Sequence, residues 1–248
     1  MVIVVAMMSE AMPIVDALGM TTQGRLHSCY PMEHYFSDRH PNVHLVINGR
    51  CPRFGVDNIA SQPATVAAFL SIEKLKPCIL LNAGTAGGFS SAGSSVGDVY
   101  LGYPSVYFHD RRIPIPRFRE FGLGGYVCPD VRPMAAALGM KTGVVSTGNS
   151  LASISTDLEI MQSYEGRAKD MEAAAIAWVA EQHRVPFIAI KAITDLVDTE
   201  KPVHEAFLEN LATASSRLAL KTVEVIDYLE THGIPAMEGS TQEGYITA

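Results

Sequence analysis

The chain has 248 residues, of which 48% are apolar and 18% charged, a composition typical of a globular protein and unlike that of a disordered one. Its net charge of −7 at pH 7, without a basic stripe, argues against nucleic acid or an anionic membrane as the main partner. No apolar run approaches the roughly 20 residues that span a bilayer. The first residues show no signal-peptide pattern, and we therefore expect a cytoplasmic protein.

Cysteine and histidine spacing gives no sign of a metal site. The 4 cysteines form no C-x-x-C pair, so we expect reduced thiols, with Cys78 buried in its apolar run. The histidines between His27 and His44 fit no standard zinc pattern. We therefore predict neither a metal nor another cofactor.

Apolar runs separated by turn-forming residues predict the elements of the first part of the chain. The expected elements are a buried strand over 2–6, a helix over 10–18 capped by Ser9, a hairpin of strands over 32–37 and 43–48, a helix within 56–74, and a buried strand over 78–81. The glycine-rich segment 84–88 then indicates either a tight strand-to-helix turn or a loop that a ligand approaches closely.

The second part of the chain continues the alternation of strands and helices. The expected elements are a strand over 98–108, a shaped loop over 109–125, a short helix over 134–138, a strand over 142–146, a helix opened by Asp170 that carries 173–182, a strand over 185–193, and a long helix over 204–230. This order predicts an α/β protein with a mainly parallel or mixed sheet. We expect one domain over 1–232 and a peripheral tail over 233–248.

Small or polar residues follow the buried strands where core packing does not require them. Glu10 follows the first strand, the segment 84–88 the second, Ser150 the third, and Thr194 with Asp195 the fourth. Ligands of open α/β sheets bind at the carboxyl ends of parallel strands. If these strands are parallel neighbours, all these residues face one crevice.

Each acidic residue also has a plain structural interpretation. Asp170 and Glu172 precede an apolar helix, where acids complement the helix dipole, although a carboxylate such as Glu172 also suits a cis-diol. Asp195 lies beside a buried strand, where an unpartnered acid is costly and can hold a raised pKa as a general acid. Glu10 alone is the weakest indication, because a glutamate in the first turn of a helix is common. The glycine segment matches no Walker loop, dinucleotide fingerprint or nucleophile elbow.

Taken together, several segments resemble a known family. They are Ala6-Met7-Met8-Ser9-Glu10, Asn82-Ala83-Gly84-Thr85-Ala86-Gly87-Gly88, Lys169-Asp170-Met171-Glu172-Ala173 and Lys191-Ala192-Ile193-Thr194-Asp195. In this order they resemble the 5′-methylthioadenosine/S-adenosylhomocysteine nucleosidases of the purine nucleoside phosphorylase-like superfamily. Residues 108–116 and 191–198 are most similar to the plant-type branch. The resemblance implies a single-domain three-layer α/β/α sandwich with a central mixed sheet.

The resemblance also implies roles for individual residues. Glu10 would activate the attacking water, Glu172 would hold the ribose hydroxyls, and Asp195 would protonate N7 of adenine. The substrate-binding set would be completed by Thr85, Ala86, Gly87, Leu151, Lys169, Asp170 and Met171. The transition state would resemble an oxocarbenium ion, which nearby carboxylates stabilise.

Departures from the family pattern concern fine specificity. Asn149 stands where relatives often have Asp, and Lys191 where bacterial members have Arg. The family pattern places residues 109–122 near a homodimer interface and the alkylthio pocket, and their apolar side chains favour an interface over an ordinary surface loop. Members of the plant-type branch tend to be narrow at the 5′ end, so we expect methylthioadenosine to be preferred over S-adenosylhomocysteine.

Two other functions compete with hydrolysis. A phosphorylase of the same superfamily would need phosphate-binding donors, but Asn82 stands where hexameric phosphorylases carry an Arg; Arg50 and Arg53 could be recruited instead. A non-catalytic storage or binding relative would have lost the acids, which are present here.

Overall fold

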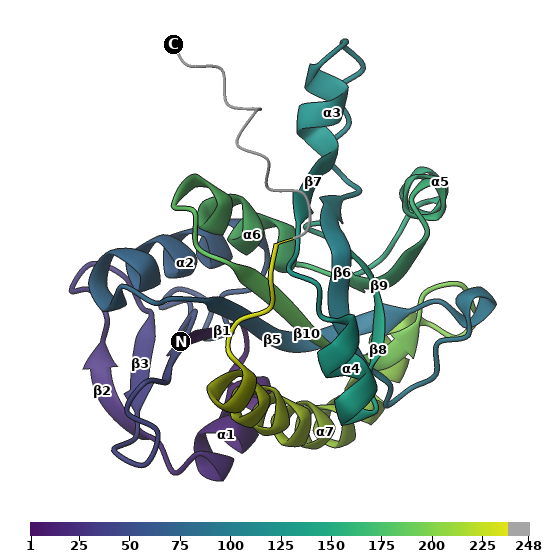
Figure 1. The fold of residues 1–248 in the computed structure, drawn as a ribbon. Coiled ribbons are helices and arrows are strands. Elements are labelled where there is room, and N and C mark those ends of the chain that lie inside the picture. Colours follow the sequence, from purple (N-terminus) through teal and green to yellow (C-terminus); the bar gives the residue numbers. More distant parts are fainter. Residues whose placement is uncertain (238–248) are drawn as a thin grey trace.

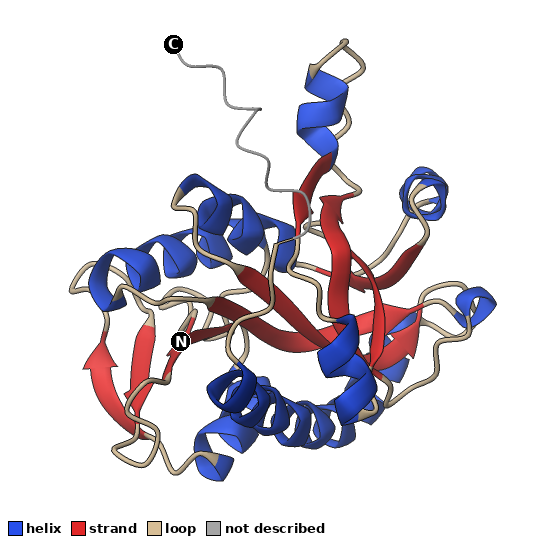
Figure 2. Cartoon of the chain, in the orientation of Figure 1, coloured by secondary structure: helices blue, strands red, loops and turns tan. Residues whose placement is uncertain are grey.

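The computed structural model describes residues 1–237, in which a central mixed sheet of 10 strands carries helices on both faces (Figures 1 and 2). In chain order the elements are β1 (Val2–Val5), α1 (Met8–Ala17), β2 (Thr21–Arg25), β3 (Glu33–Phe36), β4 (His44–Ile47), α2 (Ser61–Leu75), β5 (Leu80–Gly88), the 3₁₀ turn η1 (Ser90–Ala92), β6 (Val99–Phe108), α3 (Phe118–Leu123), β7 (Gly124–Val127), α4 (Arg132–Leu138), β8 (Lys141–Thr147), α5 (Ser155–Ser163), β9 (Gly166–Asp170), α6 (Ala173–Gln182), β10 (Phe187–Leu196) and α7 (Val203–His232). The expected α/β class and mixed sheet are confirmed. The single domain over 1–232 stays a prediction, and residues 238–248 of the expected tail lie outside the described residues.

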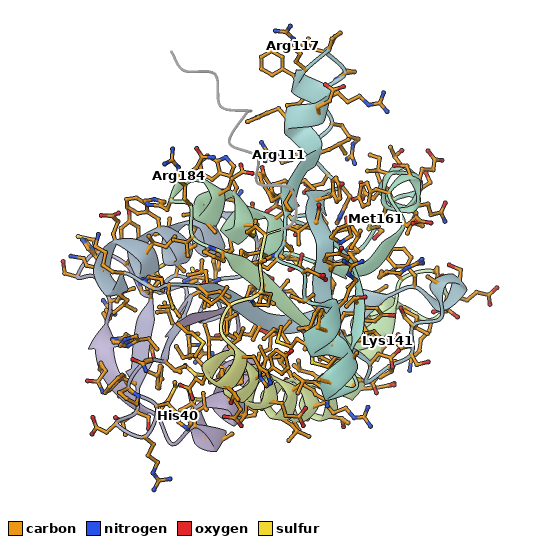
Figure 3. All side chains as sticks on the ribbon, viewed as in Figure 1. His40, Arg111, Arg117, Lys141, Met161 and Arg184 are labelled. Atoms are coloured by element: carbon orange, nitrogen blue, oxygen red, sulfur yellow. The ribbon has the colours of Figure 1, made fainter. Side chains whose placement is uncertain are left out.

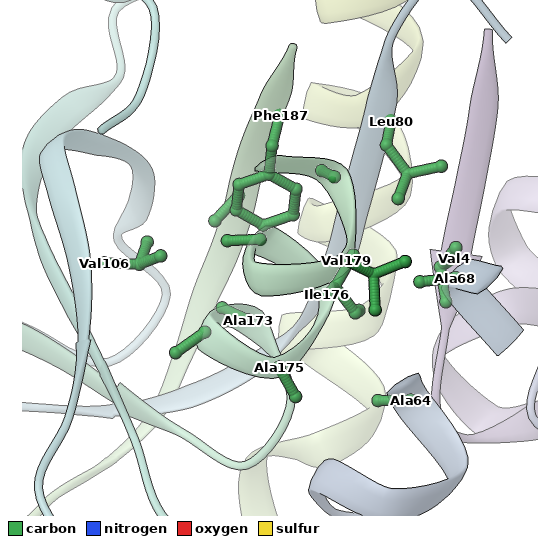
Figure 4. Close-up of a cluster of buried hydrophobic side chains, with 14 of the residues drawn as sticks. Val4, Ala64, Ala68, Leu80, Val106, Ala173, Ala175, Ile176, Val179 and Phe187 are labelled. Carbon is green, nitrogen blue, oxygen red and sulfur yellow. The ribbon is translucent and has the colours of Figure 1, made fainter. Parts of the chain in front are cut away.

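Strand β1 shows why the core has two halves. Its four residues are all buried, but their side chains alternate between the faces of the sheet. Val2 and Val4 belong to a cluster of buried apolar side chains that includes residues of helices α2 and α6 (Figure 4). Ile3 and Val5 belong to a second cluster, with helices α1, α4 and α7. A continuous apolar run therefore fits this central strand better than an alternating one would.

The sheet closes on itself at one end. Its order is β10-β6-β8-β9-β5-β1-β4-β3-β2, and β10 also pairs with β5. Strands β1 and β10 both run parallel to β5. Strand β8 instead runs parallel to β9, which is antiparallel to β5. The condition that the four strands be parallel neighbours is therefore met by β1, β5 and β10 but not by β8.

The glycine-rich segment 84–88 is neither a turn nor a loop, because it forms the second half of β5 and pairs with β10 throughout. A Cβ atom at Gly84 would lie 3.2 Å from Lys191 Nζ, and one at Gly88 would lie 3.0 Å from Ile193 Cγ2. Because these glycines have no side chain, the large residues of β10 can pack closely against the backbone of β5. This close approach overrides the low strand propensity of glycine.

The observed helices and strands differ most from the expected ones where segments are short and polar. The sequence pattern does not predict β2, β7, β9 or α5, none of which has a long apolar run. Asp170 ends β9 instead of opening a helix, and α6 begins at Ala173. Asp195 lies within β10 and not after it, because pairing with β5 extends this strand to Leu196.

Residues 109–125, here called the arm, project from the body of the molecule (Figures 1 and 3). The segment predicted as a loop contains helix α3. The guanidinium carbon of Arg111 lies 4.5 Å from the ring centre of Phe108 and 5.1 Å from that of Phe121, which ties the arm to the end of β6. More than half of each of three apolar side chains is exposed: Ile115, Phe118 and Phe121. The arm therefore presents an uncovered apolar surface.

Two further expectations concern the surface. Cys78 is exposed, so its predicted burial is wrong; it precedes β5, which begins at Leu80, and thus lies outside the buried part of the apolar run. Among residues 1–237 no helix is both long and apolar enough to cross a membrane.

His109 lies at the base of the arm and is only 2% exposed. Its Nδ1 atom lies 2.8 Å from Ser146 Oγ, which in turn lies 2.5 Å from the Tyr164 hydroxyl. Burial, with a smaller effect of the Lys169 charge, lowers the pKa of His109 from 6.5 to about 4. The unfolded chain therefore binds a proton more readily than the folded one as the pH falls.

The stabilising contribution of neutral His109 should be complete above pH 6.5 and disappear as the pH falls towards 4. The loss should approach ~3 kcal/mol of unfolding free energy. We expect His109→Asn to flatten the pH dependence of stability in this range, measured by urea unfolding at pH 7 and pH 4.5. The control is His204→Asn at an exposed site, and an equally steep dependence in both variants would contradict the assignment.

Candidate active site

All ten residues to which the family resemblance assigns a role in the site line a single cavity of about 130 Å³. They come from the first turn of α1, the second half of β5, the loop after β8, the end of β9 with the following turn, and β10. The cavity also contains Thr194, which was expected in the same crevice, and five residues to which the sequence gave no role in the site: Ala6, Met7, Ile59, Val197 and Phe207. Gly84, Gly88 and Ser150, which were also expected to face this crevice, do not line it. Ile59 lies in the segment before α2 and Phe207 lies in α7, and no local sequence signal separates them from ordinary apolar residues.

Glu10 is held rigidly although it belongs to a helix terminus. Its Oε1 atom accepts hydrogen bonds from the Thr85 backbone N–H at 2.7 Å and the Thr85 hydroxyl at 2.6 Å. Its Oε2 atom accepts a hydrogen bond from the Met7 N–H at 3.2 Å. Burial raises the pKa of Glu10, while the bonds from Thr85 and the charge of Lys191 counteract part of that rise. A carboxylate that is held in place and whose pKa is raised is a stronger base than a free one, as a general base requires.

Asp170 lines the cavity but has largely structural contacts. Its Oδ1 atom accepts a hydrogen bond from the Thr147 hydroxyl at 2.6 Å, and its Oδ2 atom accepts one from the Ala173 N–H at 2.8 Å. The fully buried Lys191 ammonium lies 2.8 Å from the same Oδ2 atom. Asp170 therefore caps α6 and also neutralises the buried Lys191. Such a pair is expected, because burying one of these charges without the other would be costly.

Glu172 faces the cavity from the turn between β9 and α6. Its Oε1 atom accepts a hydrogen bond from the Ala60 N–H at 2.8 Å. Burial and the negative charge of Asp170 raise the pKa of Glu172 to about 7, and Lys191 offsets part of the effect. Ala60 has φ 75° and ψ −177°, a backbone conformation that is nearly restricted to glycine.

Asp195 presents one oxygen that protein groups leave free. Its Oδ1 atom accepts a hydrogen bond from the Thr194 hydroxyl at 2.7 Å. The buried Oδ2 atom has no hydrogen-bond partner within residues 1–237. A Cβ atom at Gly87 would lie 2.8 Å from this Oδ2 atom, so the glycine keeps space in front of it. Burial raises the pKa of Asp195, which favours a carboxyl that carries a proton.

Lys169 brings the loop after β8 to the cavity despite the orientation of that strand. Its ammonium donates hydrogen bonds to the carbonyl oxygens of Ser150 at 2.7 Å and Leu151 at 2.8 Å. Leu151 is thereby placed at the cavity wall with 39% of its surface exposed. Burial lowers the pKa of Lys169, although the surrounding acids, Asp195 first among them, oppose this shift.

No cluster of three or more potential His, Cys, Asp or Glu metal ligands occurs in the part of the chain that the structure describes. A second hollow of about 340 Å³ lies next to α7 and contains none of the predicted site residues. Its cations already have partners: Lys141 pairs with Asp98 at 2.6 Å, and Arg217 donates to the Gly97 carbonyl at 2.8 Å. The candidate catalytic residues Glu10 and Asp195 therefore both lie in the first cavity.

Comparison with known families identifies the fold. The sequence profile of the phosphorylase superfamily matches residues 1–227. The chain belongs to the phosphorylase superfamily. A structure of Arabidopsis thaliana 5′-methylthioadenosine nucleosidase superposes on this superfamily member with a TM-score of 0.89 and 38% identity, covering 92% of this chain and 94% of the other.

Curated sequences give the same relationship. The 5′-methylthioadenosine nucleosidase of Arabidopsis thaliana is 38% identical over 231 residues, which cover 92% of this phosphorylase superfamily chain and 86% of the relative. The 5′-methylthioadenosine/S-adenosylhomocysteine nucleosidase of the same plant is 36% identical over 235 residues, covering 92% and 91% of the two chains. The family resemblance stated from the motifs is thus confirmed, and so is the nucleoside phosphorylase-like fold.

Proposed function

We propose that this chain hydrolyses the N-glycosidic bond of 5′-methylthioadenosine and releases adenine and methylthioribose, a reaction of methionine and purine salvage. The observation that carries the proposal is one cavity in which Glu10 is fixed as a base and Asp195 offers a free, protonatable oxygen. The relatives named as nucleosidases support the same conclusion. Thr85, Ala86, Gly87, Leu151, Lys169, Asp170, Met171 and Glu172 form the surrounding walls.

The proposed chemistry balances without a cofactor. Glu10 accepts a proton from water, and the water oxygen bonds to C1′ of the ribose as the bond from C1′ to N9 breaks. Asp195 gives its proton to N7 of adenine, so that the base leaves as a neutral molecule. Glu172 holds the ribose hydroxyls, and the nearby carboxylates stabilise the positive charge that develops on the sugar.

The positions of the residues that could bind phosphate favour hydrolysis over phosphorolysis. Asn82 is 1% exposed and donates a hydrogen bond to the Val4 carbonyl at 3.1 Å, inside the sheet. Arg50 donates to the Gly55 carbonyl at 2.6 Å, and Arg53 lies over the Phe54 ring. Neither arginine lines the cavity in which Glu10 lies. A non-catalytic function is disfavoured, because Glu10, Glu172 and Asp195 are all present and line one cavity.

Adenine release from 5′-methylthioadenosine, assayed with and without phosphate, tests the function. We expect equal rates and methylthioribose as the sugar product, since water is the nucleophile that Glu10 can activate. Methylthioribose 1-phosphate as the product would contradict hydrolysis. The same assay with S-adenosylhomocysteine should give a lower kcat/KM, and comparable values would contradict the expected narrow 5′ end.

The arm supports a homodimer as the working form. Its exposed apolar side chains, Ile115, Phe118 and Phe121, would be covered by a second copy of the chain, with residues 109–122 near the interface. Light scattering of the purified protein tests this assembly. A location in the cytoplasm stays a prediction that imaging of a fluorescent fusion would check.

A further inference from the structure

Asn149 connects two parts of the molecule that are far apart in sequence. Its backbone N–H and its side-chain Nδ2 both donate to Asp110 Oδ2 at the base of the arm, at 2.6 and 3.0 Å. Its Oδ1 atom accepts hydrogen bonds from the Ser61 N–H at 3.1 Å and the Ser61 hydroxyl at 2.6 Å. One amide side chain thus joins the arm to the first residue of α2.

Ser61 directly follows the residue that holds Glu172. The Ala60 N–H donates to Glu172 Oε1 at 2.8 Å, and Ala60 has φ 75° and ψ −177°. An alanine stays in such a conformation only when its surroundings hold it there. The two bonds from Ser61 to Asn149 are positioned to do so, because they fix the peptide that follows Ala60.

We propose that Asn149 is a positioning residue, which orients the Glu172 carboxylate towards the ribose by holding Ser61 and Ala60. The inference rests on the proposed nucleosidase function and adds a residue to it. It also links the arm, and hence the expected dimer contact, to the ribose end of the cavity through Asp110.

The proposal requires an amide at position 149, since the side chain must donate to one partner and accept from the other. Aspartate there would place two carboxylates about 3 Å apart, with no donor between them. Exchanging the two residues, as Asp110→Asn together with Asn149→Asp, restores a donor between the two side chains and leaves a carboxylate to accept from Ser61. The restoration is partial, because the backbone N–H of residue 149 now donates to the same Asp110 oxygen at 2.6 Å and would compete with the new donor for that position.

This exchange is the test. We expect Asn149→Asp to lower kcat/KM for 5′-methylthioadenosine about 10-fold, mainly through KM, and the exchanged pair to recover part of this loss. Inhibition by adenine should stay unchanged in all variants, because adenine lacks the ribose that Glu172 holds. Equal weakening of adenine and nucleoside binding, or no recovery in the exchanged pair, would overturn the proposal.

A second pair of variants tests the strained residue itself. Asn149→Ala should also raise KM, and adding Ala60→Gly should recover part of the loss, since glycine adopts the conformation of Ala60 without support. No recovery would show that Asn149 does not act through Ala60. The control is Asn42→Asp, which adds a charge at an exposed loop outside the cavity and should change neither constant.

The two hypotheses fail in different ways. A wild-type protein that releases no adenine from 5′-methylthioadenosine refutes the proposed function whatever the variants do. The positioning role is then judged by the rise in melting temperature that 5′-methylthioadenosine gives each variant. The same ranking, with the exchanged pair partly recovered, supports the role of Asn149, and equal rises contradict it.

Discussion

Asp195→Asn should lower kcat about 100-fold or more while changing the affinity for 5′-methylthioadenosine much less. Asparagine can still donate a hydrogen bond to N7 of adenine, but it has no proton to transfer, so the base must leave with negative charge. The free Oδ2 atom and the raised pKa of Asp195 are the features that predict this loss. Steady-state kinetics and a ligand-binding titration on the same variant measure the two quantities.

A structural role for Asp195 predicts a different result, namely a lower melting temperature with full activity in the folded fraction. Asp198 provides the matched control, because its carboxylate accepts hydrogen bonds from the Ser90 and Ser91 N–H groups at 2.7 and 2.8 Å. Asp198→Asn should therefore lower stability and leave kcat nearly unchanged. A destabilised but fully active Asp195→Asn enzyme would refute the catalytic assignment.

Glu10→Gln should leave substrate binding nearly intact and reduce kcat by about 10²- to 10⁴-fold, the range expected for a lost general base. Glutamine is nearly isosteric, and its carbonyl oxygen can still accept the bonds from Thr85, but it cannot take a proton from water. The decisive measurements are kcat and the rise in melting temperature that 5′-methylthioadenosine produces.

Glu205 is a suitable control for this variant, since it lies in the first turn of α7 and is exposed. Glu205→Gln should keep wild-type kcat, which separates the loss of a base from the loss of a helix-terminal charge. Near-wild-type turnover in Glu10→Gln would mean that another group activates the water.

The sequence by itself determined the parts of this protein that depend on local patterns. The apolar run at Val2–Val5 predicts a strand buried on both faces. The structure agrees, because successive side chains of this strand enter opposite halves of the core. The acids Glu10, Glu172 and Asp195 stand out because a carboxyl group beside a buried strand is costly unless it has a partner or a function. Their convergence on one cavity was therefore predictable, as was their membership of a known family pattern.

Tertiary structure alone decided what depends on partners distant in sequence. Segment 84–88 forms a strand because β10 packs against its bare backbone, a contact that no local propensity contains. Leu151 reaches the cavity because Lys169 binds the loop that carries it, although β8 runs opposite to β5. Asp170 is a structural partner of Lys191 because both are buried together, and a buried charge requires its counterion. Such roles follow from burial and distance, which the order of residues does not specify.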